Sequence, residues 1–209
     1  MIKQLFQGDH QNTISDGCYE IQPLSAGPVL IQEEGGKFIL VDPGAFSHKE
    51  NLITELAFLG ITPPEIDIVF NTHHHLDHIS NNFLFHTTAP IYTNSGILWQ
   101  NGKSSIYSDP AMHKLKFPSS IQMIKTPGHT EDSVSFVYEE KGVTYVCAGD
   151  AVREDIIRNK SIPSGRSDWK KFVDSMKKIF NIADVIFPGH GGVIEGDLLE
   201  ELHSIVKNM

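Results

Sequence analysis

The segment THHHLDH at residues 72–78 constrains this chain more than any other. It follows residues 66–70 (IDIVF), an apolar run typical of a buried strand. His73 and His75 are two residues apart, so on an extended backbone their side chains project to the same side. Asp77 and His78 follow at once, where the chain must turn. One short segment therefore presents four groups that can bind divalent metal ions.

Other polar residues come just after the ends of other apolar runs. His129 follows the run that ends at Ile124, Asp150 follows residues 143–148, and His190 follows residues 184–187. We expect these side chains to converge with the first cluster at one edge of a sheet. Imidazole and carboxylate suit zinc and similar divalent metals, whereas a softer site would need thiolates, and this chain has only two cysteines.

Size and composition predict one domain spanning residues 1–209, because 209 residues with 40% hydrophobic content can bury a single core. A net charge of −9 argues against non-specific nucleic-acid binding through a basic surface, although a local basic channel stays compatible with it. Cys18 and Cys147 are expected to be buried free thiols in a reducing cytoplasm. No signal peptide or long apolar stretch is apparent, so we expect a cytoplasmic protein without membrane contact.

The pattern along the chain predicts short strands alternating with amphipathic helices. The predicted strands are residues 19–21, 29–31, 38–41, 66–70, 133–138, 143–148 and 184–187. A helix should begin with Ser47 and Glu50 as a capping box and end at Gly60. A second helix should start near Ser167 or Asp168, and a short one near Asp197. Residues 95–120 and 153–166 read as loops, the first with some helix, and loops are where substrate contacts concentrate.

These motifs resemble those of the metallo-β-lactamase superfamily. Residues 72–78 match its T-H-x-H-x-D-H signature, Thr126-Pro127-Gly128-His129-Thr130 resembles its second metal motif, and Ala148-Gly149-Asp150 and Phe187-Pro188-Gly189-His190 resemble the remaining two, as in glyoxalase II-like members. Order and spacing agree over residues 18–195. The resemblance implies an α/β fold, an αββα sandwich of two mixed sheets with helices on the outer faces.

The resemblance also implies a division of metal ligands. One metal would be held by His73, His75 and His129, the other by Asp77, His78 and His190, with Asp150 bridging the two. Asp42, which follows an early strand, would support the site by holding a ligand rather than a metal; a plain Asp-Pro-Gly turn is the alternative. His74 is not a ligand in this scheme, and His10, His48, His86, His113 and His203 belong to no motif; His48 and His203 are expected at the surface.

The implied activity is that of a metal-dependent hydrolase with two divalent cations, zinc first and iron or manganese as alternatives. A metal-bound hydroxide bridging the cations would be the nucleophile, and Asp77 would accept its hydrogen bond or pass its proton to the leaving group. The substrate would be a small molecule or a short anionic molecule with an ester, thioester, lactone or phosphodiester bond. Asp150 stands where true β-lactamases of this fold typically carry a cysteine or rearranged ligands, which argues against antibiotic hydrolysis.

Within the superfamily, residues 146–151 and 183–191 are most similar to the metallo-β-lactamase domain-containing protein 1 group. The short stretch after His190 leads us to expect a minimal member without the extra domain of glyoxalase II. The similarity implies a phosphodiester substrate such as single-stranded RNA. Arg153, Arg158, Lys160 and Arg166 are then candidate contacts for an anionic substrate, with a solvated basic loop as the alternative reading.

Two other functions stay open at this stage. A mononuclear iron dioxygenase acting on a persulfide has the same fold, but it needs only two histidines and one aspartate, and this chain retains Asp77, His78 and His190 as well. A non-catalytic member kept for binding is the other alternative, and the complete ligand set argues against it. The sequence leaves open whether the chain forms a homodimer.

Overall fold

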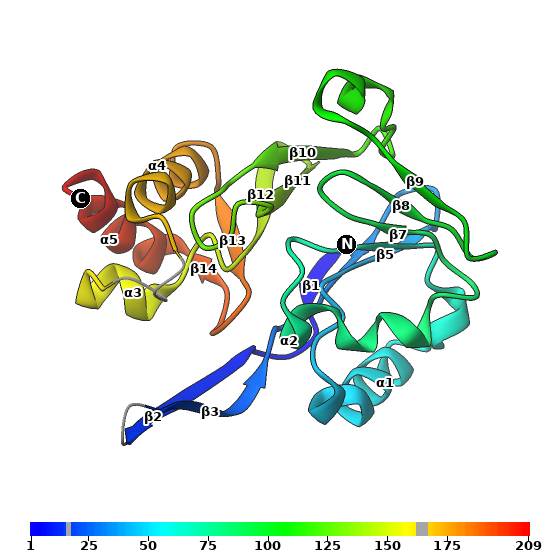
Figure 1. Ribbon diagram of the computed structural model, residues 1–209, viewed down its shortest axis with the longest axis horizontal. Helices are drawn as coiled ribbons and strands as arrows, with labels where there is room; N and C mark the ends of the chain where they lie inside the picture. The colour runs from blue at the N-terminus through cyan, green and yellow to red at the C-terminus, as the bar shows by residue number, and fades with distance from the viewer. Residues whose placement is uncertain (16–17, 162–166) are drawn as a thin grey trace.

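The computed structural model describes residues 1–15, 18–161 and 167–209. Within these residues two mixed β-sheets lie face to face, with helices outside them (Figure 1). The predicted αββα arrangement is therefore confirmed.

The larger sheet comes from the first half of the chain. In the described residues its strands lie in the order β1 (Ile2–Gln4), β4 (Val29–Gln32), β5 (Phe38–Val41), β6 (Ile68–Phe70), β7 (Ile91–Tyr92), β8 (Gly96–Leu98) and β9 (Ser104–Ile106). The pairs β5–β6 and β6–β7 are parallel and the others are antiparallel. The parallel strands β5 and β6 thus end at the same edge.

The second sheet comes from the second half of the chain. Its strands lie in the order β10 (Ile121–Lys125), β11 (Val134–Glu140), β12 (Val143–Gly149), β13 (Val185–Pro188) and β14 (Ile194–Glu195). Here β12 and β13 are the parallel pair. Their carboxyl ends lead into Asp150 and His190, so two candidate ligands leave neighbouring strands at one edge.

The core is layered in the same way as the sheets. Between the sheets, Phe70 of β6 packs against Phe136 of β11 with ring centroids 4.6 Å apart. On the outer face of the larger sheet lies α1 (Lys49–Phe58), which buries Leu52 and Leu56 against it. On the outer face of the second sheet lie α3 (Glu154–Asn159), α4 (Trp169–Phe180) and α5 (Gly196–Lys207) (Figure 1). This burial of apolar faces is the main favourable contribution to folding.

The helix α4 forms as its sequence predicts. The side chain of Asp168 caps its first turn by accepting a hydrogen bond from the backbone N–H of Lys171 at 3.1 Å. Phe172, Met176 and Ile179 recur at helical spacing and are fully buried.

The start of α1 differs from the prediction. The hydroxyl of Ser47 does not cap the helix; it lies 2.9 Å from Nδ1 of His48, and a 3-10 turn (Phe46–His48) precedes α1. A capping box occurs instead at Thr62 and Glu65, ahead of β6, which begins at Ile68 rather than Ile66. The motif alone did not distinguish the two positions, because both have the required spacing.

Both predicted loops contain more structure than expected. Residues 95–120 include the hairpin β8–β9 and a 3-10 helix (Asp109–Lys114). Residues 153–166 include α3, while residues 162–166, with the candidate Arg166, lie outside the described part.

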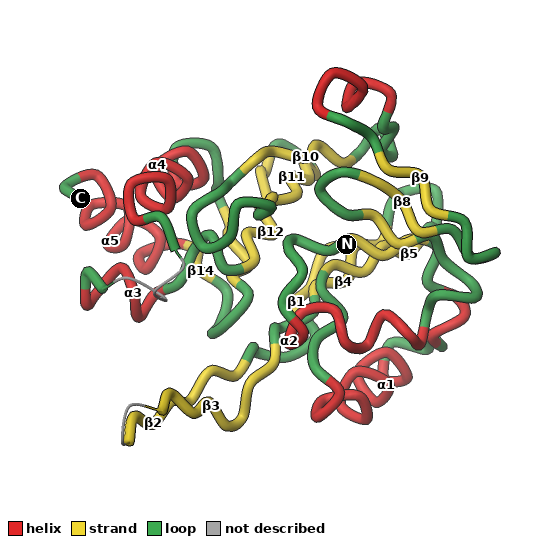
Figure 2. The backbone as a smooth tube through the Cα atoms, viewed as in Figure 1, coloured by secondary structure: helices red, strands yellow, loops and turns green. Residues whose placement is uncertain are grey.

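A hairpin of β2 (Asp9–Ser15) and β3 (Cys18–Ser25) extends away from the sheets (Figures 1 and 2). Its first residues are tied to the body of the protein, since Gly8 forms an antiparallel bridge with Gly191. The hairpin was predicted only in part, as a strand at residues 19–21.

Cys147 is a buried free thiol, as expected. The side chain of Cys18 lies outside the described residues. Of the helices in the described ranges, none is both long enough and apolar enough to cross a membrane.

Candidate metal centre

Four chain segments bring the predicted ligands to one edge of the sandwich. After β6 the chain bends at Thr72 and His73 and is extended at His75, and the four-residue helix α2 (Leu76–Ile79) then turns the chain. His73 and His75 therefore precede the turn, while Asp77 and His78 lie within it. His129, Asp150 and His190 follow β10, β12 and β13.

The carboxylate of Asp150 lies in the middle of the histidines. Its Oδ2 atom is 3.3 Å from Nε2 of His129. Its Oδ1 atom is 3.2 Å from Nε2 of His78 and 3.4 Å from Nε2 of His190. The two oxygens of one carboxylate thus face histidines on two different sides.

Three overlapping groups of side chains have ligand atoms close enough to hold a metal ion. Within each group these atoms lie within 4.8 Å of one another; the groups are His73, His75 and His129; His73, His78 and Asp150; and Asp77, His78 and His190. The first and third groups are the two ligand sets that the sequence predicted, and the second joins them through Asp150.

Asp42 supports the candidate ligands through hydrogen bonds. Its Oδ1 accepts from the backbone N–H of Thr72 at 2.8 Å, and its Oδ2 accepts from the Thr72 hydroxyl at 2.6 Å and from Nδ1 of His78 at 2.8 Å. Because the Thr72 hydroxyl donates to Asp42, its oxygen can accept from Nδ1 of His73, which is 3.1 Å away. Asp42 therefore orients His78 directly and His73 through Thr72.

His190 is oriented by the main chain. Its Nδ1 lies 3.0 Å from the carbonyl oxygen of Asp9. A carbonyl only accepts, so Nδ1 carries the proton and Nε2 points towards Asp77 and Asp150, 3.2 and 3.4 Å away.

The orphaned ring atoms indicate that this cluster fits metal ions. Among the described residues, buried side-chain atoms without a well-aligned hydrogen-bond partner include Nε2 of His73, His78 and His190 and Oδ1 of Asp150. Buried polar atoms normally have hydrogen-bond partners, and a cluster of unpaired ones therefore needs an explanation. Divalent cations that prefer imidazole and carboxylate would satisfy them together.

The charges in the cluster are coupled. Burial disfavours the charged forms of His78 and His190, but Asp150 and its neighbouring carboxylates outweigh burial; they raise the pKa of His78 well above its ordinary value and that of His190 to about 9. Burial lowers the pKa of His73 well below its usual range and that of His129 to about 4. Burial would raise the pKa of Asp77, but the hydrogen bond with His190 and the charge of His78 hold it at about 2.

We expect the two groups to respond differently to pH. A cation entering beside His78 and His190 must displace protons, because without metal the pKa of His78 is raised well above its ordinary value and that of His190 to about 9, whereas the pKa values of His73 and His129 are lowered. Acidification from pH 8 to pH 6 should therefore empty the Asp77–His78–His190 group first, with affinity falling about tenfold per pH unit for each proton. Calorimetric titration with zinc in buffers of different ionisation enthalpy measures the protons released; zero protons released at pH 7 would contradict this expectation.

Other candidates from the sequence lie apart from the cluster. His74 is exposed and its Nδ1 contacts the carboxylate of Asp132, so it faces away from its neighbours as expected. The prediction that His48 lies at the surface is wrong. His48 is buried, and its Nε2 contacts the carboxylate of Asp9 at the start of β2. Its role has no local motif and could not be inferred from spacing.

The glycine of Pro188-Gly189-His190 is required by close packing. A Cβ atom at Gly189 would overlap the carboxylate of Asp150 and the ring of His78. The motif therefore keeps two strand ends close enough for their side chains to meet.

The chain is similar to known proteins in both sequence and fold. The model of the Metallo-beta-lactamase superfamily matches residues 25–93. A protein of Methanocaldococcus jannaschii named as a probable metallo-hydrolase is 34% identical over 160 residues, which are 75% of this chain and 72% of the relative.

Metallo-beta-lactamase domain-containing protein 1 of Xenopus laevis is 31% identical over 161 residues, 76% of this chain and 68% of the relative. The similarity to this group, inferred from residues 146–151 and 183–191, is thus confirmed. Among solved structures, a metallo-beta-lactamase family protein of Thermus thermophilus is similar with a TM-score of 0.58 at 20% identity, covering 88% of this chain and 75% of the other. At that identity the likeness concerns the fold.

Proposed function

This chain belongs to the metallo-β-lactamase superfamily, whose members related to it are metallo-hydrolases, and from that premise we propose that it is a dinuclear metal-dependent hydrolase. His73, His75 and His129 bind one divalent cation and Asp77, His78 and His190 bind the other, with Asp150 as the bridge. Zinc is the metal that suits this donor set first.

The position of Asp150 is the observation that carries the proposal. Its Oδ2 lies beside His129 of one group, while its Oδ1 lies beside His78 and His190 of the other, all within 3.4 Å. A mononuclear site would need only one of these sides. The full set of ring nitrogens on both sides favours two cations over the single iron of a dioxygenase.

Two bound cations would lower the pKa of coordinated water towards about 7 and polarise the substrate oxygen under attack. Asp77 supplies the proton chemistry. Its pKa of about 2 keeps the carboxylate ionised at neutral pH, and its side chain is largely but not fully buried. As a carboxylate beside the metal ions, it would accept a hydrogen bond from the attacking water or pass the water's proton to the leaving group.

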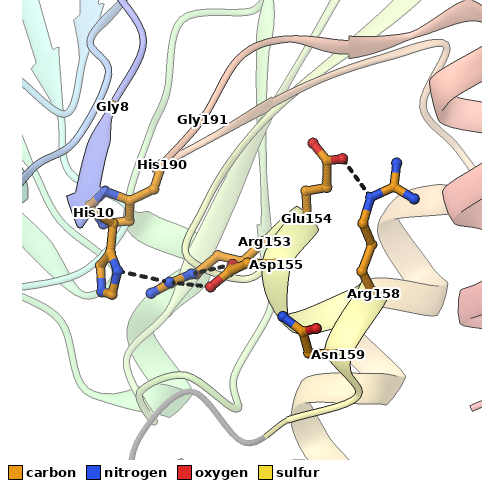
Figure 3. Close-up of a pocket in the computed structure, with 9 residues that line it drawn as sticks. All are labelled: Gly8, His10, Arg153, Glu154, Asp155, Arg158, Asn159, His190 and Gly191. Atoms are coloured by element: carbon orange, nitrogen blue, oxygen red, sulfur yellow. Dashed lines mark hydrogen bonds and ion pairs between the residues drawn. The ribbon is translucent and has the colours of Figure 1, made fainter. Parts of the chain in front are cut away.

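A pocket of about 500 Å³ beside His190 receives the rest of the substrate (Figure 3). Apart from glycines, its described lining residues are polar: His10, Arg153, Glu154, Asp155, Arg158, Asn159 and His190. Arg153 is buried and bonded to Asp155 and His10, and Arg158 pairs with Glu154 and Glu201. With both signs of charge in its wall, the pocket favours a small polar substrate portion over a long acyl chain.

The test is hydrolysis by the zinc-loaded protein of a short panel: an acetyl and a decanoyl thioester, γ-butyrolactone, bis(4-nitrophenyl) phosphate and a single-stranded oligoribonucleotide. We expect turnover of at least one class, abolished by a chelator and restored by added zinc. Where the thioesters are substrates, the acetyl compound should exceed the decanoyl compound in kcat/KM by at least about tenfold, a discrimination that shape and polarity of a pocket commonly give. Absence of turnover for every class in the fully loaded protein contradicts the proposal, and oxygen uptake with a persulfide would assign the dioxygenase instead.

A further inference from the structure

The first residues of the β2–β3 hairpin form a wall of the candidate metal centre. Gly8 lies flush against the loop after β13: the N–H of Gly191 donates to the Gly8 carbonyl at 2.9 Å, and a Cβ at Gly8 would overlap the carbonyl of Gly189. The ring of His10 lies edge-on to that of His190, with centroids 5.1 Å apart (Figure 3). Asp9 lies between Gly8 and His10, and its carbonyl oxygen accepts a hydrogen bond from Nδ1 of His190.

The position of Asp9 is fixed by a hydrogen bond between its carboxylate and His48. Its Oδ2 lies 2.9 Å from Nε2 of His48, and because a carboxylate accepts, Nε2 donates. The other ring nitrogen of His48 then accepts from the hydroxyl of Ser47, 2.9 Å away. His48 is 9% exposed and its ring stacks on that of Phe6, with centroids 5.8 Å apart. A buried histidine that forms hydrogen bonds through both ring nitrogens thus fixes the carboxylate of Asp9.

We propose that Asp9 and His48 are positioning residues for the metal site of Asp77, His78 and His190, called here the second metal site. The hydrogen bond between His48 and Asp9 fixes the position of the Asp9 backbone carbonyl, which orients His190. This inference rests on the proposed function, since it assigns His190 to one of two cations. The effect is confined to one side of the centre. Among the described residues, the side-chain hydrogen bonds of His48 go to Ser47 and Asp9. Neither of them involves His73, His75 or His129, which form the other ligand group.

The assignment differs from a general stabilising role in what it does to the two metals. An outer partner of a ligating histidine fixes the ring and its tautomer, and its loss commonly weakens metal binding about 10- to 100-fold. Removal of the Asp9 carboxylate leaves the carbonyl in the chain but loosens its placement. The low end of that range, about tenfold, is therefore expected for the second metal, with the first unchanged.

The experiment titrates the full chain with zinc against a chromogenic chelator and, separately, records the visible absorption of the cobalt-substituted protein at one and two equivalents. Asp9→Ala and His48→Phe should each weaken the second equivalent about tenfold and alter only the spectrum that the second cobalt adds. His48→Phe keeps a ring to stack on Phe6 and removes the hydrogen bond; the side chain of His48 makes no capping bond to α1, so the helix start is preserved. His48→Gln and Asp9→Asn, which retain a donor and an acceptor, should restore the affinity to within about threefold of wild type.

His203→Phe is the matched control. His203 also packs against a phenylalanine, Phe180 at 5.7 Å, and bonds one side chain, Asn181 at 3.3 Å, but it lies on α5 away from the cluster. Wild-type metal binding is expected for it. Wild-type affinity for both metals in Asp9→Ala and His48→Phe, or equal weakening of both metals, overturns the inference while leaving the hydrolase proposal standing. A wild-type chain that binds fewer than two metals overturns both. If the two disruptive variants do not fold, Asp9→Asn and His48→Gln still decide, since a loss of the second metal well beyond threefold in both contradicts the hydrogen-bond assignment.

Discussion

Asp150→Asn is expected to cause the largest loss of activity of any single substitution in the cluster, more than about 100-fold in kcat. Asparagine keeps the size of the side chain but replaces one oxygen by an NH₂ group and removes the negative charge. Since the two oxygens of Asp150 face His129 on one side and His78 and His190 on the other, neither orientation of the amide can serve both sides. Loss of an outer partner alone commonly costs 10- to 100-fold, and a shared ligand should cost more.

The measurement for Asp150→Asn is kcat together with metal content after dialysis. We expect about one metal per chain instead of two. Asp174→Asn serves as the control, because Asp174 is exposed on α4, is not among the lining residues of the neighbouring pocket and belongs to none of the three candidate ligand groups. An Asp150→Asn protein that keeps two metals and more than a tenth of wild-type activity would show that Asp150 is not the bridge.

Asp42→Ala is expected to produce the largest combined loss of stability and metal affinity. The substitution leaves three buried donors unpaired: the N–H and hydroxyl of Thr72 and the Nδ1–H of His78. Removing one partner of a buried charged pair costs about 3–5 kcal/mol. Asp42 also has a positive φ of 48°, which aspartate and asparagine tolerate better than alanine. Metal affinity should fall about 10- to 100-fold, since His73 and His78 both lose their support.

Urea denaturation of the metal-free protein and competitive zinc titration measure the two effects of Asp42→Ala separately. Asp42→Asn provides the matched comparison, because it keeps the backbone preference and an accepting oxygen. We expect it to recover part of the stability while metal affinity stays low. Wild-type stability in Asp42→Ala would mean that the plain Asp-Pro-Gly turn, rather than support of His78, explains this residue.

The parts of the site that sequence could predict are those encoded locally. His73, His75, Asp77 and His78 lie in one segment, and the strand and turn that place them follow from spacing alone. His129, Asp150 and His190 could be added because each follows an apolar strand. The layered fold followed from the same strands and from the resemblance that their motifs carry.

Long-range contacts between unlike segments could not be predicted. Asp9 and His190 are 181 positions apart, and the contact between them is made by a backbone carbonyl that any residue possesses. His48 was expected at the surface because it belongs to no motif, yet it is buried, with its ring stacked on that of Phe6. The capping box expected at Ser47 and Glu50 does not form, since the hydroxyl of Ser47 contacts His48 instead.

The basic residues after Asp150 show a similar limit. Their charges suggested contacts with an anionic substrate, but Arg158 is held by Glu154 and Glu201, the second of which lies 43 positions away on α5. Arg153 is buried against Asp155 and His10. Whether a charge is available to a substrate depends on such partners, which a sequence read in order does not reveal.

The most direct test of the dinuclear centre is the metal content of the protein purified without chelators or added metal, measured by elemental analysis per chain. We expect two equivalents of divalent metal, zinc or zinc with iron or manganese, in wild type and about one equivalent in Asp150→Asn. One iron per wild-type chain, or no metal and no uptake when zinc is added, would contradict the dinuclear centre.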